Sequence, residues 1–408
     1  MDSSMDNSIA FRSNDRWLLP WTFVVFTIFF LSILRGIRFP NIWSYSHFLF
    51  NYEFGLVKRG LIGEIIKHFD SPWLSSYNFF VIVSALIFIA NIMLLSLLIR
   101  DLLNSRNSVL IGGSVIFVSS LAVVFLSHSI GYFDHIGLLI TLVTIRINGF
   151  GRKILFLLPS LTLGLLIHEA ITIIFFPVIF MSLLFDVQAE NRKNQFMWLV
   201  LLSILVISFT WWVSNLTIEK PKTQEMYNNL QTKTGYALRK DAFNVLHRSG
   251  KDNFIIMKKK WFQEERWLSL IKSFLGIFPV LLTIMYLMVY MLRESNTKVY
   301  LLILAVLASL SPQLLHMFGW DRYRWNTLTI TTSFLMLYVV YRSRNHLLLT
   351  KLPNNIYPIF ILVIFLNGIS TIQLFDGYSV KLFPFTEHRA YIIDVITGKE
   401  KWPYLPKR

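Results

Sequence analysis

The stretch NYEFGLVKRGLIG, residues 51 to 63, combines a carboxylate, two adjacent cations and three glycines in a connection between two long apolar segments. Glu53 is suited to remove a proton from an acceptor hydroxyl, and Lys58 and Arg59 are suited to hold the phosphate oxygens of a leaving group. The glycines would let the backbone approach a ligand closely. The alternative is a loop at the membrane surface whose cations meet lipid headgroups.

A second polar cluster, SHSIGYFDHIG, spans residues 127 to 137. It contains His128, Asp134 and His135, which are suitable ligands for a divalent cation or a second acid/base pair. We therefore treat a divalent cation as a possible cofactor. The alternative is a polar turn in which Asp134 caps the next helix.

The pair His168-Glu169 lies in the middle of an otherwise apolar stretch, residues 154 to 185. Ionisable groups in such a setting are expensive and commonly functional. We take both residues as candidate acid/base groups. The alternative is a structural pair that joins two helix ends.

The stretch HMFGWDRYRWN, residues 316 to 326, places Asp321, Arg322 and Arg324 between aromatic residues. Guanidinium groups bind phosphate through two parallel hydrogen bonds, and aromatic rings suit the faces of sugars. These residues, with Lys58, Arg59 and His135, form the predicted substrate and phosphate site. The alternative is an aromatic belt whose arginines reach up to lipid headgroups.

The composition defines the elements that must position these groups. The chain is 54% hydrophobic and only 15% charged, whereas soluble proteins are about a quarter charged. Apolar runs of about 18 to 25 residues recur along it, which is typical of a multi-pass membrane protein. The net charge of +16 lies mostly in the connections, which favours lipid or phosphate ligands over nucleic acid. Without cysteine there is no thiolate nucleophile or zinc–thiolate site.

We predict an all-helical fold of about 11 spans in a single transmembrane domain, with the polar clusters on the extracytoplasmic face. The expected segments are a cytoplasmic arm at 1–16, outer loops at 38–77 and 218–266, and an outer tail at 376–408. The long loop 218–266 could close over a bound substrate.

Residues 154 to 185 are expected to form two short spans that meet near His168 on the outer side. If this stretch instead crosses once, every later loop changes side. The basic 218–266 loop would then be cytoplasmic.

The cytoplasmic N-terminus, the long first outer loop with an acidic residue, and the polar clusters on one face resemble the GT-C class of polyprenyl-phosphate-dependent glycosyltransferases. The length and layout also look like O-antigen or capsule polymerases of the Wzy type, which join undecaprenyl-pyrophosphate-linked repeat units. The resemblance implies that Glu53, or Asp70, stands where the GT-C class has a catalytic aspartate. It also implies that Arg59, Arg322 and Arg324 fill the place of the functional arginines of Wzy-type polymerases.

The sequence therefore predicts a glycosyltransferase of the bacterial inner membrane that uses a polyprenyl-linked sugar donor. Its partners would be the lipid bilayer and other polysaccharide-assembly proteins. Candidate catalytic residues are Glu53, Asp134, His168 and Glu169. The alternatives are a transporter or flippase whose charged residues line a path, and a non-catalytic scaffold.

Overall fold

The computed structural model describes residues 15–69, 71–190, 193–234, 236–261, 263–344 and 356–369, together with 374, 375, 380, 393 and 397. Within these ranges every regular element is a helix, which confirms the all-helical fold class. Most of the predicted arm at 1–16 and of the tail at 376–408, and also Asp70, lie outside the described residues.

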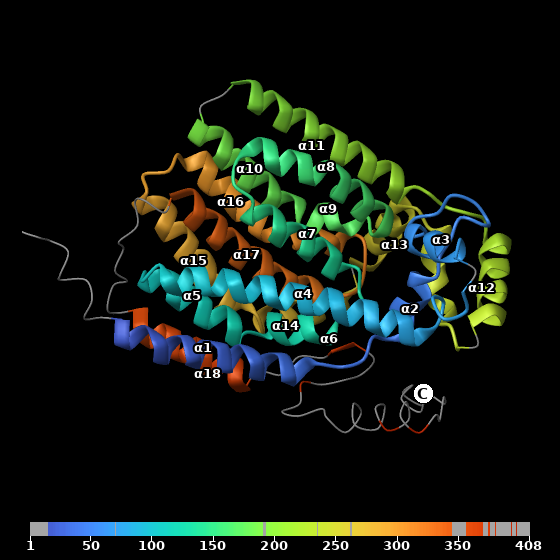
Figure 1. The fold of residues 1–408 in the computed structure, drawn as a ribbon, viewed down its shortest axis with the longest axis horizontal. Coiled ribbons are helices and arrows are strands. Elements are labelled where there is room, and N and C mark those ends of the chain that lie inside the picture. Colours follow the sequence, from blue (N-terminus) through green and yellow to red (C-terminus); the bar gives the residue numbers. More distant parts are fainter. Residues whose placement is uncertain are drawn as a thin grey trace, which may run out of the picture.

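Most helices form one elongated bundle with roughly aligned axes (Figure 1). The central helix α17 (Arg322–Arg344) is buried along most of its length and contacts helices from both halves of the chain. The bundle also contains α1 (Asp15–Gly36), α4 (Tyr77–Asn104), α5 (Ser108–Ser119), α6 (Leu121–His128), α7 (Asp134–Arg146), α8 (Phe150–Ile167), α9 (Ala170–Ile174), α10 (Phe176–Glu190), α11 (Lys193–Ser214), α15 (Phe278–Glu294), α16 (Val299–Leu310), η2 (Ser311–Met317) and α18 (Tyr357–Ile369).

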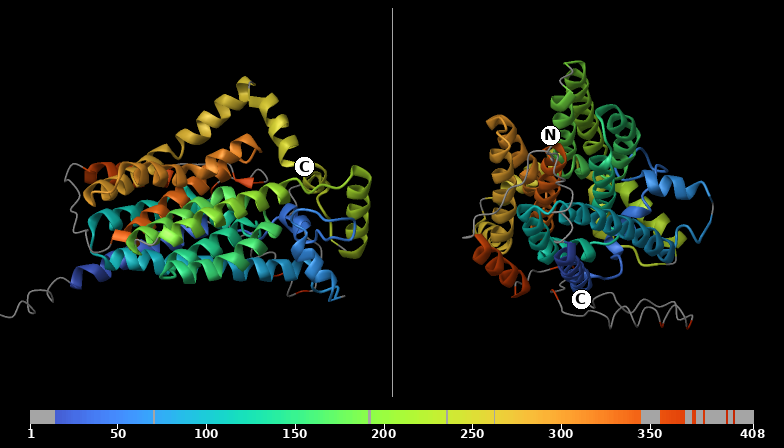
Figure 2. Two further views of the ribbon diagram at one scale, coloured as in Figure 1. Left: turned by 90° about the horizontal axis from the view of Figure 1, so that it is seen from above. Right: turned by 60° about the vertical axis from the view of Figure 1, so that its left-hand side comes forward.

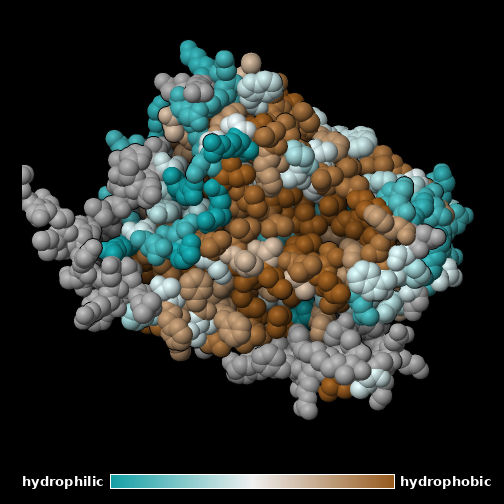
Figure 3. Space-filling model, viewed as in Figure 1, coloured by the Kyte–Doolittle hydropathy of each residue, from teal (hydrophilic) through white to brown (hydrophobic). Residues whose placement is uncertain are grey.

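The number of helices suited to cross a membrane is smaller than predicted. Four in the described part are long and apolar enough, namely α4, α8, α11 and Val299–Met317, and two bent pairs raise the number to at most six. The prediction of about 11 spans is therefore not met. The reason is that several of the predicted spans form short helices: the apolar parts of α1 and α18, Pro20–Gly36 and Tyr357–Gly368, fall below 18 residues, and α7 and α10 have only 13 and 15 residues. The surface still shows an apolar band between polar ends (Figure 3).

The chain breaks and reverses at His168, which ends α8. At the far end of the pair, Lys153 near the start of α8 forms a 2.8 Å ion pair with Asp186 near the end of α10. Helices α8 and α10 therefore run antiparallel. This geometry is the one that the two-span interpretation of 154–185 requires.

The two long connections fold together into one cap at an end of the bundle (Figure 1). We define the cap as α2 (Ile42–Phe48), α3 (Leu61–Lys67), α12 (Lys220–Thr234) and η1 (Lys240–His247), with the segments between α2 and α3 and between α12 and η1. It has its own hydrophobic core, in which Tyr45, Phe50 and Phe243 are almost fully buried. The loops 38–77 and 218–247 therefore lie at the same end of the bundle.

The rest of the 218–266 connection is also helical and leaves the bundle as a bent arm (Figure 2). The arm consists of α13 (Gly250–Trp261) and α14 (Glu264–Leu275). Its α14 exposes the apolar side chains Trp267, Leu268, Ile271 and Leu275. Amphipathic helices of this kind are typical of membrane interfaces.

Candidate functional site

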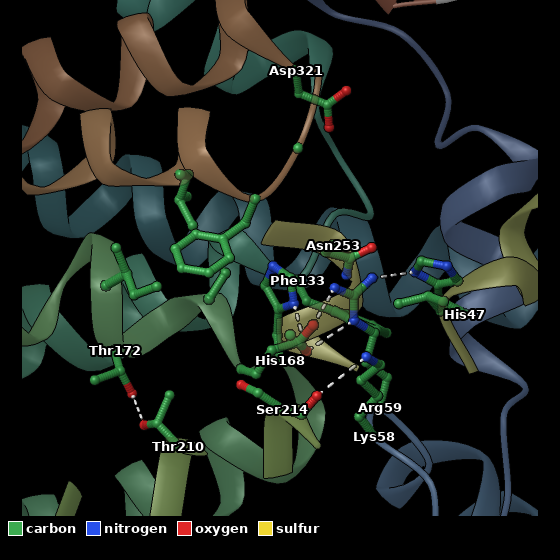
Figure 4. Close-up of a pocket in the computed structure, with 18 of the residues that line it drawn as sticks. His47, Lys58, Arg59, Phe133, His168, Thr172, Thr210, Ser214, Asn253 and Asp321 are labelled. Atoms are coloured by element: carbon green, nitrogen blue, oxygen red, sulfur yellow. Dashed lines mark hydrogen bonds and ion pairs between the residues drawn. The ribbon is translucent and has the colours of Figure 1, made fainter. Parts of the chain in front are cut away.

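A cavity of about 680 Å³ lies where the cap, the arm and the end of the bundle meet (Figure 4). Its wall combines α2 and the following loop, the junction between α8 and α9, the last turns of α11, the start of α13, and the connection between η2 and α17. Of the predicted site residues, the cavity wall brings together Lys58, Arg59, His168, Glu169, Asp321 and Arg324.

Arg59 and Glu169 form the closest ion pair of the cavity. The guanidinium donates from Nε to Oε2 at 3.0 Å and from Nη2 to Oε1 at 2.6 Å, so the pair is bidentate. The backbone of Arg59 is left-handed, with φ of 64°. Side chains other than glycine rarely adopt this conformation, and such strain concentrates at functional sites. The fold thus holds a costly backbone geometry that aims this arginine at the cavity.

His47 supports Arg59 from the cap. Arg59 Nη1 lies 3.2 Å from His47 Nδ1, and His47 Nε2 lies 3.1 Å from the Ala242 carbonyl oxygen. Because arginine can only donate, Nδ1 must accept and Nε2 must carry the proton. Burial and the Arg59 cation lower the pKa of His47 well below its usual range, which agrees with a neutral ring. The histidine therefore orients Arg59 without adding charge.

A second set of charged groups continues from Glu169. His168 lies with Nε2 3.3 Å from Asp134 Oδ1 and with Nδ1 3.6 Å from Glu169 Oε2. Arg324 bridges Asp134 Oδ2 at 3.4 Å and Asp321 Oδ2 at 3.2 Å. Asp134 is buried and makes no capping hydrogen bond to α7. The capping role considered for Asp134 is therefore wrong, and the carboxylate instead holds His168 and Arg324.

Lys58 lies next to Arg59 and is almost fully buried. Its ammonium donates to the carbonyl oxygens of Arg248 at 2.5 Å and Ser214 at 3.5 Å. Burial lowers its pKa to about 8, although the Glu169 carboxylate opposes the shift. Lys58 is thus a cation near neutral pH that has only neutral hydrogen-bond acceptors.

The cavity wall carries more positive than negative charge. Lys58, Arg59, Lys251 and Arg324 face the carboxylates of Glu169 and Asp321. Asp134, which pairs with Arg324 from outside the wall, adds a third carboxylate, so four cations face three anions. An anionic group of the size of a phosphate or pyrophosphate would balance this excess.

Several predicted site residues lie elsewhere. Glu53 does not line the cavity and instead pairs with Lys67 at 3.8 Å and Lys233 at 3.6 Å on the surface of the cap. Arg322 is also absent from the wall, and its guanidinium carbon lies 5.1 Å from the centre of the Tyr323 ring. These positions do not place Glu53 or Arg322 where they could touch a ligand in the cavity.

The three groups proposed to bind a divalent cation do not converge. His128 Nδ1 lies 3.3 Å from the Gly36 carbonyl oxygen, whereas His135 Nε2 lies 3.4 Å from Ser129 Oγ. The Asp134 carboxylate instead lies next to His168 and Arg324. Within the described residues, no three His, Asp or Glu side chains are placed to hold a metal ion.

The glycines of the 51 to 63 stretch serve the fold rather than a ligand. A Cβ on Gly63 would lie 2.2 Å from the Phe50 carbonyl oxygen, and one on Gly60 would lie 2.4 Å from the Tyr52 ring. Neither glycine lines the cavity. They allow α3 to pack tightly against the chain that follows α2.

The sequence did not single out several residues of the wall. His47 is the most important of these, and Trp43, Lys251, Asn253 and Phe254 are others. The only signal for His47 was a lone histidine in an aromatic stretch, which does not distinguish a site residue from a core residue. Lys251 and Asn253 belong to a stretch with no motif in its sequence. They reach the cavity because α13 begins there.

No family model, no curated protein and no solved structure matches this chain. The fold and the cavity alone define its class: an all-helical protein with several helices long and apolar enough to cross a membrane and a charged cavity under a cap. Any function has to be argued from that cavity.

Proposed function

We propose that this protein transfers a sugar or an oligosaccharide repeat unit from an undecaprenyl-phosphate- or pyrophosphate-linked donor during synthesis of a surface polysaccharide. The observation that carries the proposal is the excess of cations in a cavity whose wall also includes His168, which pairs with Asp134 outside the wall. Phosphate recognition and proton transfer are the two tasks that such a reaction requires.

The cavity also suits the lipid part of the donor. Ile207 and Trp211 of α11 line the cavity, yet they are 61% and 67% exposed on the outside of the bundle. Phe254 of α13 and Phe318 after η2 line it as well and are partly exposed. The wall thus reaches the apolar surface, and an isoprenoid chain could extend from here into the bilayer while its phosphates stay on the cations.

The proposed reaction is a displacement at the anomeric carbon of the donor. The acceptor oxygen bonds to that carbon, the bond to the phosphate oxygen breaks, and the acceptor proton moves to the enzyme. His168 is the best-placed proton acceptor. Its Nε2 faces Asp134, and its Nδ1 has no hydrogen-bond partner among the described residues. Glu169 is a weaker base because Arg59 occupies both of its oxygens.

In this proposal Lys58, Arg59 and Arg324 stabilise the charge that develops on the departing phosphate. Lys251 adds to the positive field from the arm side. We further propose that the cap faces the extracytoplasmic side of a bacterial inner membrane, with the N-terminus in the cytoplasm. Arg12 and Arg16, just before the first apolar run, and the basic connection at 100–106 support this orientation through the positive-inside tendency.

Lipid binding tests the proposal directly. Native mass spectrometry of the full chain in detergent should show bound undecaprenyl pyrophosphate, and the bound fraction should fall strongly in Lys58→Met and Lys251→Gln. Lys222→Gln is the matched control, because this exposed lysine lies on α12 outside the cavity. No binding of the lipid by the parent chain would overturn the proposal and favour a scaffold, and export of the lipid without sugar transfer would favour a flippase.

A further inference from the structure

A second hollow, of about 280 Å³, lies in the cap between α12 and η1. Lys220, Thr223, Gln224 and Tyr227 line one wall, and Lys240, Phe243, Asn244 and His247 line the other, with Arg248 at its edge. The four residues of α12 are spaced i, i+3, i+4 and i+7 and form one face of that α-helix, whereas η1 is a 3-10 helix, on which Lys240 and Phe243, and likewise Asn244 and His247, lie one turn apart. Side chains of the two elements therefore form the two walls of one groove.

The charge of this groove is entirely positive. Lys220, Lys240 and Arg248 line it, and no carboxylate does. The described residues contain no carboxylate within ion-pair distance of these three cations, whereas neighbouring Arg239 is paired with Asp241 at 2.8 Å. Like charges held together without counterions favour binding of an anion. Burial and the charges of Arg248, Lys220 and Lys58 also lower the pKa of His247, as expected in a positive field.

The remaining lining groups suit a sugar. Thr223, Gln224 and Asn244 offer hydrogen-bonding groups to hydroxyls. Tyr227 packs edge-on against Phe243 with ring centres 5.3 Å apart, which gives the groove an aromatic, apolar side. Polar groups beside an apolar ring are the usual composition of a small-molecule site.

The groove is also connected to the main cavity. The carbonyl oxygen of Arg248 accepts the 2.5 Å hydrogen bond from Lys58, while Arg248 itself lines the groove. Gly250 and Lys251, two and three residues further on, line the cavity. One short segment, residues 248–251, therefore forms part of both walls.

We propose that the groove between α12 and η1 binds an acidic saccharide, a sugar unit that carries a carboxylate or phosphate. This inference rests on the proposed function, in which the bound saccharide is part of the polymer that the cavity extends. The groove would hold the acidic unit while a neighbouring hydroxyl reaches the cavity.

Calorimetry of the full chain in detergent micelles tests this site without any transfer reaction. The probe is tetragalacturonate, with neutral maltotetraose as its uncharged counterpart. We expect tetragalacturonate to bind and maltotetraose not to bind. The double variant Lys240→Gln/Arg248→Gln should weaken tetragalacturonate binding by about tenfold or more, because the groove loses two of its three cations. Lys222→Gln, also on α12, should bind as the parent does.

Two further measurements separate this site from the main cavity. Lys251→Gln should keep tetragalacturonate binding even though it weakens the lipid, so failure of the proposed function and failure of the groove have different signatures. Loss of tetragalacturonate binding in Lys251→Gln but not in Lys240→Gln/Arg248→Gln would overturn the inference. Inorganic phosphate that binds as tightly as the acidic saccharide would also overturn it, because the groove would then recognise only charge.

Discussion

Arg59 donates two hydrogen bonds, of 3.0 and 2.6 Å, to the Glu169 carboxylate, although the two residues are 110 positions apart in the sequence. The pair joins the cap to the break between α8 and α9, so it fixes one wall of the cavity to the other. Both side chains are mostly buried, with 11% and 16% of their surface exposed. The pair therefore connects the cap to the bundle and is also part of the charged cavity wall.

Removal of Arg59 should destabilise the fold. Arg59→Ala leaves the Glu169 carboxylate buried without its cation, which should cost about 2 to 4 kcal/mol in unfolding free energy. The double variant Arg59→Ala/Glu169→Ala should lose less than the sum of the two single variants. Denaturant unfolding in detergent measures these differences. Fully additive losses would contradict the coupling.

The left-handed backbone of Arg59 predicts a further difference between two variants at this position. Arg59→Gly and Arg59→Ala both lose the ion pair, but glycine adopts φ of 64° without the cost that alanine pays, about 1 kcal/mol. The glycine variant should therefore unfold at a higher denaturant concentration than the alanine variant. Equal stability would mean that the backbone is unstrained.

The positions of the acid/base groups predict which side chains are needed for sugar transfer. His168→Ala should lower transfer by about 10² to 10⁴-fold, and Asp134→Asn should also lower it because the ring loses its orienting partner. Glu53→Gln should stay close to the parent, since Glu53 lies on the surface of the cap. A Glu53→Gln variant that is folded yet inactive would restore the role that the sequence suggested and would contradict this geometry.

The buried Lys58 predicts a pH dependence with a definite sign. With a pKa near 8, compared with 10.5 normally, Lys58 is cationic below pH 8 and loses its charge above it. Binding of undecaprenyl pyrophosphate should therefore weaken as the pH rises above 8. The free energy of unfolding should change in the opposite direction. Between pH 8 and 10.5, Lys58 keeps its proton in the unfolded chain but not in the folded chain, so the free energy of unfolding should rise with pH. Lys58→Arg should bind the lipid without this pH dependence, and an unchanged profile would contradict the role of Lys58.

Gly63 provides a test of the packing that supports the site. In Gly63→Ala the new methyl group meets the Phe50 carbonyl oxygen at 2.2 Å, so the variant should lose about 1 to 3 kcal/mol. Gly151→Ala is the control, because nothing lies within 4 Å of its Cβ and it lies in helix α8. Alanine there should be neutral or slightly stabilising. Equal effects of the two variants would contradict the close contact.

The orientation of the cap can be measured because the chain has no native cysteine. A single cysteine at Lys222 in the cap should react with a membrane-impermeant maleimide in intact spheroplasts. A cysteine at Arg152, near the start of α8 at the other end of the bundle, should react only after permeabilisation. The reverse pattern would place the cavity on the cytoplasmic side.

Six of the residues singled out from the sequence line the cavity, but the way they come together could not be predicted. Residue type and an apolar setting were enough to single out Arg59, His168, Glu169 and Arg324. Their pairing could not be predicted, because long-range contacts depend on how two connections fold into one cap. The place of Glu53 outside the cavity could not be predicted for the same reason, since a polar stretch in the sequence does not show which way its side chains face.

The number of spans could not be predicted because an apolar run in the sequence gives neither the length nor the continuity of the helix that it forms: α7 and α10 have only 13 and 15 residues. Ser120 accepts a hydrogen bond from Ala122 and starts α6 within an apolar run. The run therefore forms two bent helices where a hydropathy profile shows one span. The break at His168 was predictable, because 154–185 is too long for one crossing and contains ionisable side chains.

The central claim is that the cavity performs sugar transfer on a polyprenyl-linked donor. The most direct measurement is the size distribution of surface polysaccharide, with its polyprenyl-linked precursors, in cells that lack this chain and carry either the parent or His168→Ala. We predict that His168→Ala, at parental protein level, fails to restore the polymer and leaves complete repeat units or a unit one sugar short on the lipid. Normal polysaccharide and precursors in cells without the chain, or full rescue by His168→Ala, would contradict the account.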